Sequence, residues 1–81
     1  MKISVKLYSS FREIVGTKEE QLDVAEGTTV QMLLDSYADR FPKIGRMKDH
    51  VILSVNKEYG HPNRKLRDGD EVSFLPPVSG G

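Results

Sequence analysis

The chain of 81 residues contains no cysteine. This absence excludes disulfide bonds, thiol nucleophiles, cysteine-ligated zinc sites and iron–sulfur clusters together. The chain also lacks a long run of charges of one sign, and its 12 Lys and Arg residues balance 12 Asp and Glu residues. Because nucleic acids and anionic membranes attract proteins with a basic excess, neither is an expected ligand. Another protein is therefore the expected partner.

Long apolar segments are also absent. No stretch has the length of a signal peptide or of a membrane span, so we expect a cytoplasmic protein. A chain of this length forms one compact domain, whose interior has little room for a deep substrate pocket. We therefore expect the chemistry at the surface of the domain or in a partner.

Alternating apolar and polar residues predict four β-strands. They cover residues 2–8, 20–24, 51–56 and 71–75. In the first strand every second side chain from Ile3 to Leu7 faces inward, so Tyr8 is expected to point outward. A turn is expected over residues 60–63. Asp68-Gly69-Asp70 predicts a tight turn before the last strand, and turn chemistry explains both aspartates better than acid–base catalysis does.

One long helix is predicted from Val30 to Phe41, where apolar side chains recur at helical spacing. Thr28 or Thr29 is the expected N-cap, and Pro42 marks the expected end of the helix.

A short helix is expected after the first strand. Ser10-Phe11-Arg12-Glu13 matches a capping box, in which the serine caps the helix and the glutamate returns to the amide of the cap. Gly16 can end such a helix in the left-handed conformation. Residues 43–50 have no clear pattern.

The order strand, strand, long helix, strand, strand predicts an α+β fold in which the main helix packs on one face of a mixed sheet. This is the β-grasp, or ubiquitin-like, arrangement. We expect a β-grasp domain over residues 1–75 and a flexible, projecting C-terminal tail over residues 76–81. The pattern leaves the order of the strands in the sheet open.

The predicted tail begins with two stiff residues and ends with two residues that have no side chain. It reads Pro76-Pro77-Val78-Ser79-Gly80-Gly81. The two prolines stiffen the exit from the last strand, and the two glycines let an extended chain enter a narrow channel because they have no Cβ. A terminal carboxylate becomes reactive once ATP-dependent adenylation has activated it, and then either sulfur or an amine can attack it. We therefore expect Gly81 to be the reacting residue.

Several segments of the chain match a known family over essentially its whole length. They are Phe11 to Gly16, Val55-Asn56, Leu66, Asp68 to Val72 and the complete tail from Pro76 to Gly81. On these segments the chain resembles the small subunits of molybdopterin synthase, ubiquitin-like sulfur carriers that share the MoaD/ThiS family with the thiazole-forming carriers. The tail is the most specific segment, because thiazole carriers share Gly-Gly but usually lack the two prolines.

The resemblance implies a reaction route. An E1-like adenylyltransferase would use ATP to adenylate Gly81, and a sulfur donor enzyme would convert it to a thiocarboxylate. The large subunit of molybdopterin synthase would take residues 76–80 into its active site, where the sulfur passes to a cyclic pyranopterin phosphate in molybdenum cofactor biosynthesis. The chain itself would bind no cofactor and would be the non-catalytic sulfur-donor subunit of a heteromeric sulfurtransferase. A heterotetramer of two small and two large subunits is also implied.

Three apolar residues are candidates for contact with these partners. Tyr8 and Leu75 are expected to be partly exposed, and Tyr59 would complete an apolar patch beside the root of the tail. The resemblance implies that the family grips its partners at the corresponding places, although Leu75 and Tyr59 depart from the residue types expected there.

The remaining polar residues favour structural roles. His50 and His61 have no second histidine at ligand spacing, which argues against a metal site. A basic cluster indicates a solvated surface or the steering of an acidic partner. This cluster consists of Lys57, Arg64, Lys65 and Arg67.

Three other functions stay open. The chain could be a ubiquitin-like modifier that Gly81 joins to lysines of other proteins, a carrier of the thiazole pathway, or an interaction domain without any tail chemistry. The two prolines of the tail count against the thiazole pathway. If binding and cellular function survive the deletion of Gly81, the chain is an interaction domain without tail chemistry.

Overall fold

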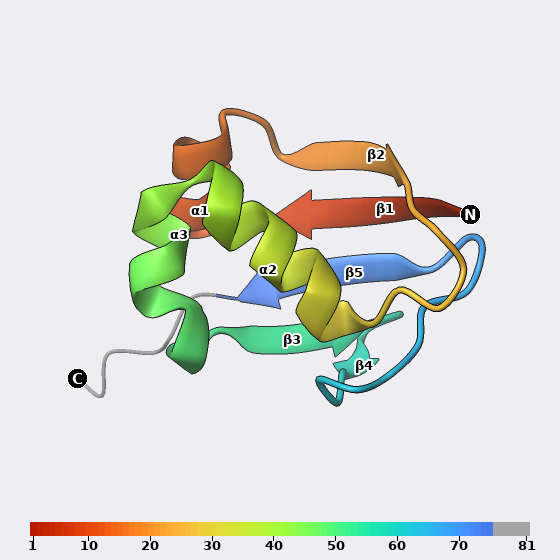
Figure 1. Cartoon of the computed structure of the whole chain (residues 1–81). Coiled ribbons are helices and arrows are strands. Elements are labelled where there is room, and N and C mark those ends of the chain that lie inside the picture. The colour runs from red at the N-terminus through yellow and green to blue at the C-terminus, as the bar shows by residue number, and fades with distance from the viewer. Residues whose placement is uncertain (76–81) are drawn as a thin grey trace.

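The computed structural model describes residues 1–75, and the predicted tail lies outside the described residues. It shows one sheet covered on one face by helices (Figure 1). The strands are β1 (Lys2–Leu7), β2 (Glu19–Asp23), β3 (Ile52–Val55), β4 (Glu58–Tyr59) and β5 (Glu71–Leu75). The helices are α1 (Ser9–Val15), α2 (Val30–Arg40), α3 (Pro42–Met47) and a short 3-10 helix, η1 (Lys48–His50).

The five strands form one mixed sheet in the order β2-β1-β5-β3-β4. The two central strands, β1 and β5, are parallel, and the other pairs are antiparallel. Helix α2 crosses one face of this sheet (Figure 1). The predicted α+β, β-grasp architecture is therefore confirmed, and the structure supplies the strand order that the sequence pattern had left open.

The core lies between α2 and the sheet. Alternate residues of each central strand enter it, among them Val5 of β1 and Phe74 of β5, both with 0% exposure. Helix α2 contributes Val30, Leu33, Leu34 and Tyr37. Full burial of one large apolar side chain stabilises a fold by roughly 1.5–3 kcal/mol. The inward faces predicted for the first and last strands are thus confirmed.

The predicted capping box at the start of α1 is wrong. The helix begins at Ser9, directly after β1, and its N-cap is Tyr8, whose side chain makes no capping hydrogen bond. The carbonyl oxygen of Tyr8 instead accepts from the amide of Phe11 at 3.0 Å. This early start turns Phe11 into the core, where it is fully buried. Gly16 ends the helix in the left-handed conformation, as predicted, with a φ of 93°.

Pro42 ends α2 and also opens α3. Phe41 is extended and serves both as the C-cap of α2 and as the N-cap of α3. A proline fits the first turn of a helix because the amide that it lacks would have no intrahelical partner there. The residues without a sequence pattern therefore form α3 and η1, and Ile44 of α3 is buried in the core. The predicted N-cap of α2 is confirmed at Thr29, whose side chain accepts from the amide of Met32 at 3.2 Å.

A two-residue turn follows β3, and the predicted turn over residues 60–63 is present as a separate turn, in which the amide of Arg64 donates to the carbonyl of His61 at 2.9 Å. Asn56 and Lys57 have positive φ values of 53° and 68°, which suit a two-residue hairpin turn. The chain then returns as β4, a strand of two residues that the sequence pattern did not reveal. Two residues are too few for alternation to be seen. The predicted turn at Asp68-Gly69-Asp70 is present, with a φ of 87° at Gly69.

Candidate functional site

The root of the tail lies at the centre of one end of the sheet. Strand β5 stops at Leu75, which pairs with Ile52 of β3, and the preceding Phe74 pairs with Leu7 of β1. Helix α1 starts directly after β1, and α3 and η1 lead into β3. The end of β5 is therefore flanked by helices on one face of the sheet (Figure 1).

The residues predicted to react and to enter a partner's channel follow this point. Pro76, Pro77, Val78, Ser79, Gly80 and Gly81 all lie outside the described residues. Their roles stay predictions. The structure shows where the segment that leads to Gly81 begins, which is the end of β5 at Leu75.

An apolar patch covers the outer face of the sheet beside the root of the tail. Tyr8 is 44% exposed and Tyr59 is 74% exposed, while Leu75 is half-buried. Leu75 follows the inward Phe74, so its side chain takes the outer face, and its partner Ile52 shares that face. Tyr8 and Leu75 follow paired residues of parallel strands and are neighbours, as predicted. Their role in docking stays a prediction.

Ile52 was missed as a member of this patch. It is 41% exposed and lies on β3, between β5, which bears Leu75, and β4, which bears Tyr59. Tyr59 pairs with Ser54, two residues from Ile52, so it also belongs to the outer face. The signal was present in the sequence, because a strand that turns Val51 and Leu53 inward must turn Ile52 outward.

The outer face becomes polar away from the root of the tail. Lys6, Ser73 and Ser54 pair in a row across β1, β5 and β3. Lys6 Nζ lies 3.4 Å from Glu71 Oε1, and this hydrogen bond and the charge of Glu71 raise the pKa of Lys6. On β1, β5 and β3 the apolar part of the face is thereby confined to the end from which the tail departs, and Tyr59 extends it on the edge strand β4, opposite Ser54.

Both aspartates of the last turn have structural partners. Asp70 is 8% exposed, and its carboxylate accepts from the side-chain amide of Asn56 at 2.9 Å and from the backbone amide of Arg67 at 2.8 Å. Asp68 accepts from the amide of Lys2 at 2.7 Å. These contacts agree with turn chemistry and leave no need for an acid–base role.

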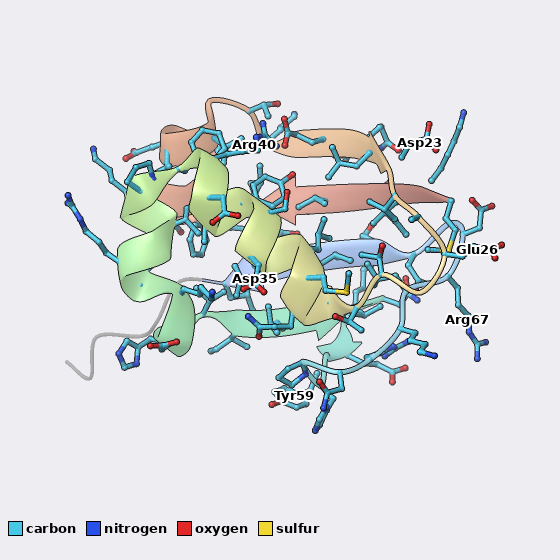
Figure 2. The ribbon with its side chains drawn as sticks, viewed as in Figure 1. Asp23, Glu26, Asp35, Arg40, Tyr59 and Arg67 are labelled. Carbon is cyan, nitrogen blue, oxygen red and sulfur yellow. The ribbon has the colours of Figure 1, made fainter. Side chains whose placement is uncertain are left out.

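The basic cluster lies at the other end of the sheet. Figure 2 shows Arg67 at the end opposite to the point where β5 stops. The backbone beside it is anchored to the start of α2, since Val30 donates to the carbonyl of Arg64 at 3.0 Å and Lys65 bridges to Thr29. The ion pairs formed within residues 1–75 involve Lys6, Arg40 and Lys48 and none of the cluster's residues. Steering of an acidic partner stays a prediction.

Metal-binding clusters and membrane-spanning helices are both absent from residues 1–75. This region has no group of three or more His, Cys, Asp or Glu residues that could hold a metal ion. His61 is exposed, and its Nδ1 accepts from the amide of Asn63 at 3.2 Å. None of the helices described is long and apolar enough to cross a membrane.

Comparison with known proteins gives consistent results. The ThiS family matches residues 5–81. The molybdopterin synthase sulfur carrier subunit of Arabidopsis thaliana is 32% identical and covers 100% of this chain and 84% of its own length. The subunit of the same name from Mycobacterium tuberculosis is 35% identical, and the match covers 100% of this chain and 99% of that subunit. The crystal structure of small archaeal modifier protein 1 (SAMP1) from Haloferax volcanii superposes with a TM-score of 0.83, 28% identity and full coverage of both chains.

Proposed function

The chain belongs to the ThiS family, and from this premise we propose that it is the sulfur carrier subunit of a molybdopterin synthase. The observation that supports this most directly is the match over the whole chain to two sulfur carrier subunits of that enzyme, at 32% and 35% identity. The tail, with Pro76-Pro77 before the terminal Gly80-Gly81, supports the same branch of the family.

The proposed chemistry takes place at the carboxylate of Gly81. A carboxylate oxygen attacks the α-phosphorus of ATP in the E1-like adenylyltransferase, and pyrophosphate leaves. Hydrosulfide supplied by the donor enzyme then attacks the acyl carbon and displaces AMP, so that sulfur replaces one oxygen and a thiocarboxylate results. In the large synthase subunit this sulfur displaces an oxygen substituent from a carbon of the cyclic pyranopterin phosphate. Water then cleaves the acyl–sulfur bond, which leaves the sulfur on the pterin and returns Gly81 to a carboxylate.

Docking must be reversible under this proposal. A dithiolene contains two sulfurs and one tail brings a single sulfur, so each carrier must leave after transfer and be recharged. The domain supports this by presenting its tail from the end of β5, beside the patch of Tyr8, Ile52, Leu75 and Tyr59. The six residues after Leu75 span at most about 20 Å when extended. The partner's active site therefore lies within that distance of the docked domain.

The experiment that tests the proposal is intact mass spectrometry of the protein from its native cells. The expected spectrum contains a form in which one oxygen of Gly81 is replaced by sulfur, and the C-terminal peptide locates the change. A chain that lacks Gly81 is the control and should show no such form. Absence of the sulfur form under conditions that require molybdopterin would contradict the proposal.

A second candidate function is that of a ubiquitin-like protein modifier. It is favoured by the 28% identity with the protein named small archaeal modifier protein 1. In that case an amine of a target lysine, not sulfur, attacks the adenylate of Gly81 and forms an amide. The same mass spectra distinguish the two functions, because a modifier gives branched peptides in which Gly81 is joined to lysine.

A further inference from the structure

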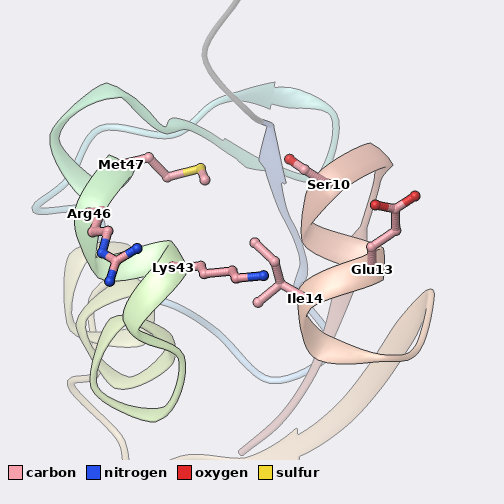
Figure 3. A pocket seen from close by; sticks show the side chains of 6 residues that line it. All are labelled: Ser10, Glu13, Ile14, Lys43, Arg46 and Met47. Carbon is pink, nitrogen blue, oxygen red and sulfur yellow. The ribbon is translucent and has the colours of Figure 1, made fainter.

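A surface pocket of about 470 Å³ lies between α1 and α3. Figure 3 shows it from close by, with Met47 and Lys43 reaching from α3 and Ile14 from α1 into the space between the two helices. The residues that line the pocket are Ser10, Glu13, Ile14, Lys43, Arg46 and Met47. Ile14 and Met47 also pack against the core, so they form an apolar floor.

The rim of this pocket is predominantly cationic. Lys43 and Arg46 are both exposed. Neither takes part in the ion pairs found within residues 1–75. Glu13 is the one acidic residue of the lining, and in Figure 3 its carboxylate points away from the gap between the helices. The pocket therefore suits an apolar group that is accompanied by negative charge.

The pocket lies beside the root of the tail. Its walls, α1 and α3, belong to the segments that flank the end of β5: α1 follows β1, and α3 leads through η1 into β3. The outer patch at Tyr8, Ile52 and Leu75 lies on the opposite face of the same end of the sheet. A protein that encloses the tail therefore meets the pocket on one side of the root and the patch on the other.

The chemistry of the lining favours a protein segment over a small metabolite. Small-molecule sites enclose their ligand and hold it with a few buried polar groups that converge on it. Here the charged groups are exposed at the rim and the apolar groups are at the centre, which is the usual arrangement in protein–protein interfaces.

We propose that the pocket between α1 and α3 is a docking site for an acidic segment of the large synthase subunit, the partner whose active site the tail is proposed to enter. An apolar side chain of that segment enters between Ile14 and Met47, and its neighbouring carboxylates pair with Lys43 and Arg46. This inference rests on the proposed function, because it assumes that a partner receives Gly81.

The test is the double charge reversal Lys43→Glu/Arg46→Glu in the full-length chain. Its binding to the adenylyltransferase and to the large synthase subunit of the same organism is measured separately by calorimetry at two salt concentrations. We expect the Kd for the large synthase subunit to rise by about tenfold or more, with a weaker salt dependence than in the wild type. The neutral variant Lys43→Gln/Arg46→Gln should give a smaller rise. Both positions are exposed, so the melting temperature should hardly change.

A matched control carries the same charge change at the far end of the sheet. Lys65 and Arg67 belong to the basic cluster, whose predicted steering would act mainly on the rate of association, so Lys65→Glu/Arg67→Glu should raise the Kd clearly less than Lys43→Glu/Arg46→Glu does. Equal weakening by both reversals would show an effect of net charge and would overturn the proposal. So would unchanged binding of the Lys43/Arg46 variant to the large synthase subunit while the wild type gains its thiocarboxylate, even where binding to the adenylyltransferase weakens. A wild type that binds neither protein and gains no sulfur would instead contradict the proposed function.

Discussion

Tyr37 connects the buried core to the surface of the sheet. Its ring is fully buried and meets Phe74 edge to face, with ring centroids 5.4 Å apart. Its hydroxyl donates to Glu20 Oε1 at 2.5 Å, and the same oxygen lies 3.6 Å from a guanidinium nitrogen of Arg40. Burial and the hydrogen bond to Glu20 raise the pKa of the Tyr37 hydroxyl. The neutral hydroxyl thus fastens α2 to β2, the edge strand of the sheet.

Replacement of this hydroxyl should weaken the fold without reshaping the core. We expect Tyr37→Phe to lower the free energy of unfolding by about 1–2 kcal/mol, because the Glu20 carboxylate loses its shortest hydrogen bond. Urea unfolding followed by circular dichroism gives this difference. Glu20→Gln is the control, since it retains an acceptor for the hydroxyl and should cost less. A Tyr37→Phe variant as stable as the wild type would show that the hydrogen bond has no net value.

Asn56 combines an unusual backbone conformation with two side-chain bonds. Its φ is 53°, its Nδ2 donates to Asp70 Oδ1 at 2.9 Å, and its Oδ1 accepts from the amide of Glu71 at 2.9 Å. Asparagine tolerates a positive φ better than most residues do. This one side chain therefore ties the hairpin of β3 and β4 to the start of β5.

Two substitutions separate these contributions of Asn56. Asn56→Gly keeps the backbone conformation and removes both side-chain bonds, so we expect a loss of about 2 kcal/mol in the free energy of unfolding. Asn56→Ala adds backbone strain and should lose roughly 1 kcal/mol more. Thermal and urea unfolding measure both values. If the glycine variant equals the wild type, the bonds to Asp70 and Glu71 contribute nothing.

At the scale of elements, periodicity predicted the strands and the helix that bury one regular face of apolar side chains. The last strand was predicted over its observed range, and the first strand and the long helix within one residue at either end, because their apolar residues recur at the period of the element. The stretch after Pro42 had no such pattern, since it is built from two very short helices. The capping box failed because Ser10 and Glu13 lie inside a helix that the end of β1 had already started.

The candidate site was predictable only in part. Alternation placed Tyr8 and Leu75 on the outer face of the sheet, and the structure confirms that they are exposed or half-buried there. The pocket between α1 and α3 could not be foreseen, because Ile14 and Met47 are brought together by tertiary packing across 33 positions of the sequence. The strand order that sets the tail between these elements is likewise a property of long-range pairing.

An ion pair between Asp35 of α2 and Lys48 of η1 links two elements and makes stability depend on pH. Lys48 Nζ lies 2.7 Å from Asp35 Oδ1, and the hydrogen bond from Lys48, together with one from Gln31, lowers the pKa of Asp35 below its ordinary 3.8. The same pairing raises the pKa of Lys48 above 10.5. A lowered carboxyl pKa stabilises the fold above the ordinary value, and the contribution disappears as the pH falls through the lowered pKa.

Asp35→Asn should therefore lower the melting temperature slightly near neutral pH and not at strongly acid pH. The effect should be small because both side chains are more than a third exposed to solvent. Melting curves of the wild type and the variant should converge as the pH falls below about 3.8, and again as it rises beyond the raised pKa of Lys48. A difference that persists unchanged at pH 2 would assign the effect to something other than this pair.

At the scale of the whole molecule, stability and the proposed chemistry belong to different parts of the chain. Within the described residues 1–75, the buried core residues lie between Ile3 and Phe74, and the strand pairings of the sheet extend to Leu75. The carboxylate that we propose to react is six residues further on, at Gly81. We therefore propose that residues 1–75 fold as a domain and that residues 76–81 contribute only to the transfer of sulfur.

Two truncations test this separation. A chain that ends at Leu75 and a chain that lacks only Gly81 should both unfold with a free energy within about 0.5 kcal/mol of the wild type, because both retain all the core side chains described in residues 1–75. Neither should acquire sulfur when incubated with ATP, the adenylyltransferase and the sulfur donor enzyme. If the chain that ends at Leu75 is strongly destabilised while the other is not, residues 76–80 contribute to the fold, and the boundary of the domain must be moved toward Gly80. If the chain without Gly81 still gains sulfur, the reacting carboxylate is not that of Gly81.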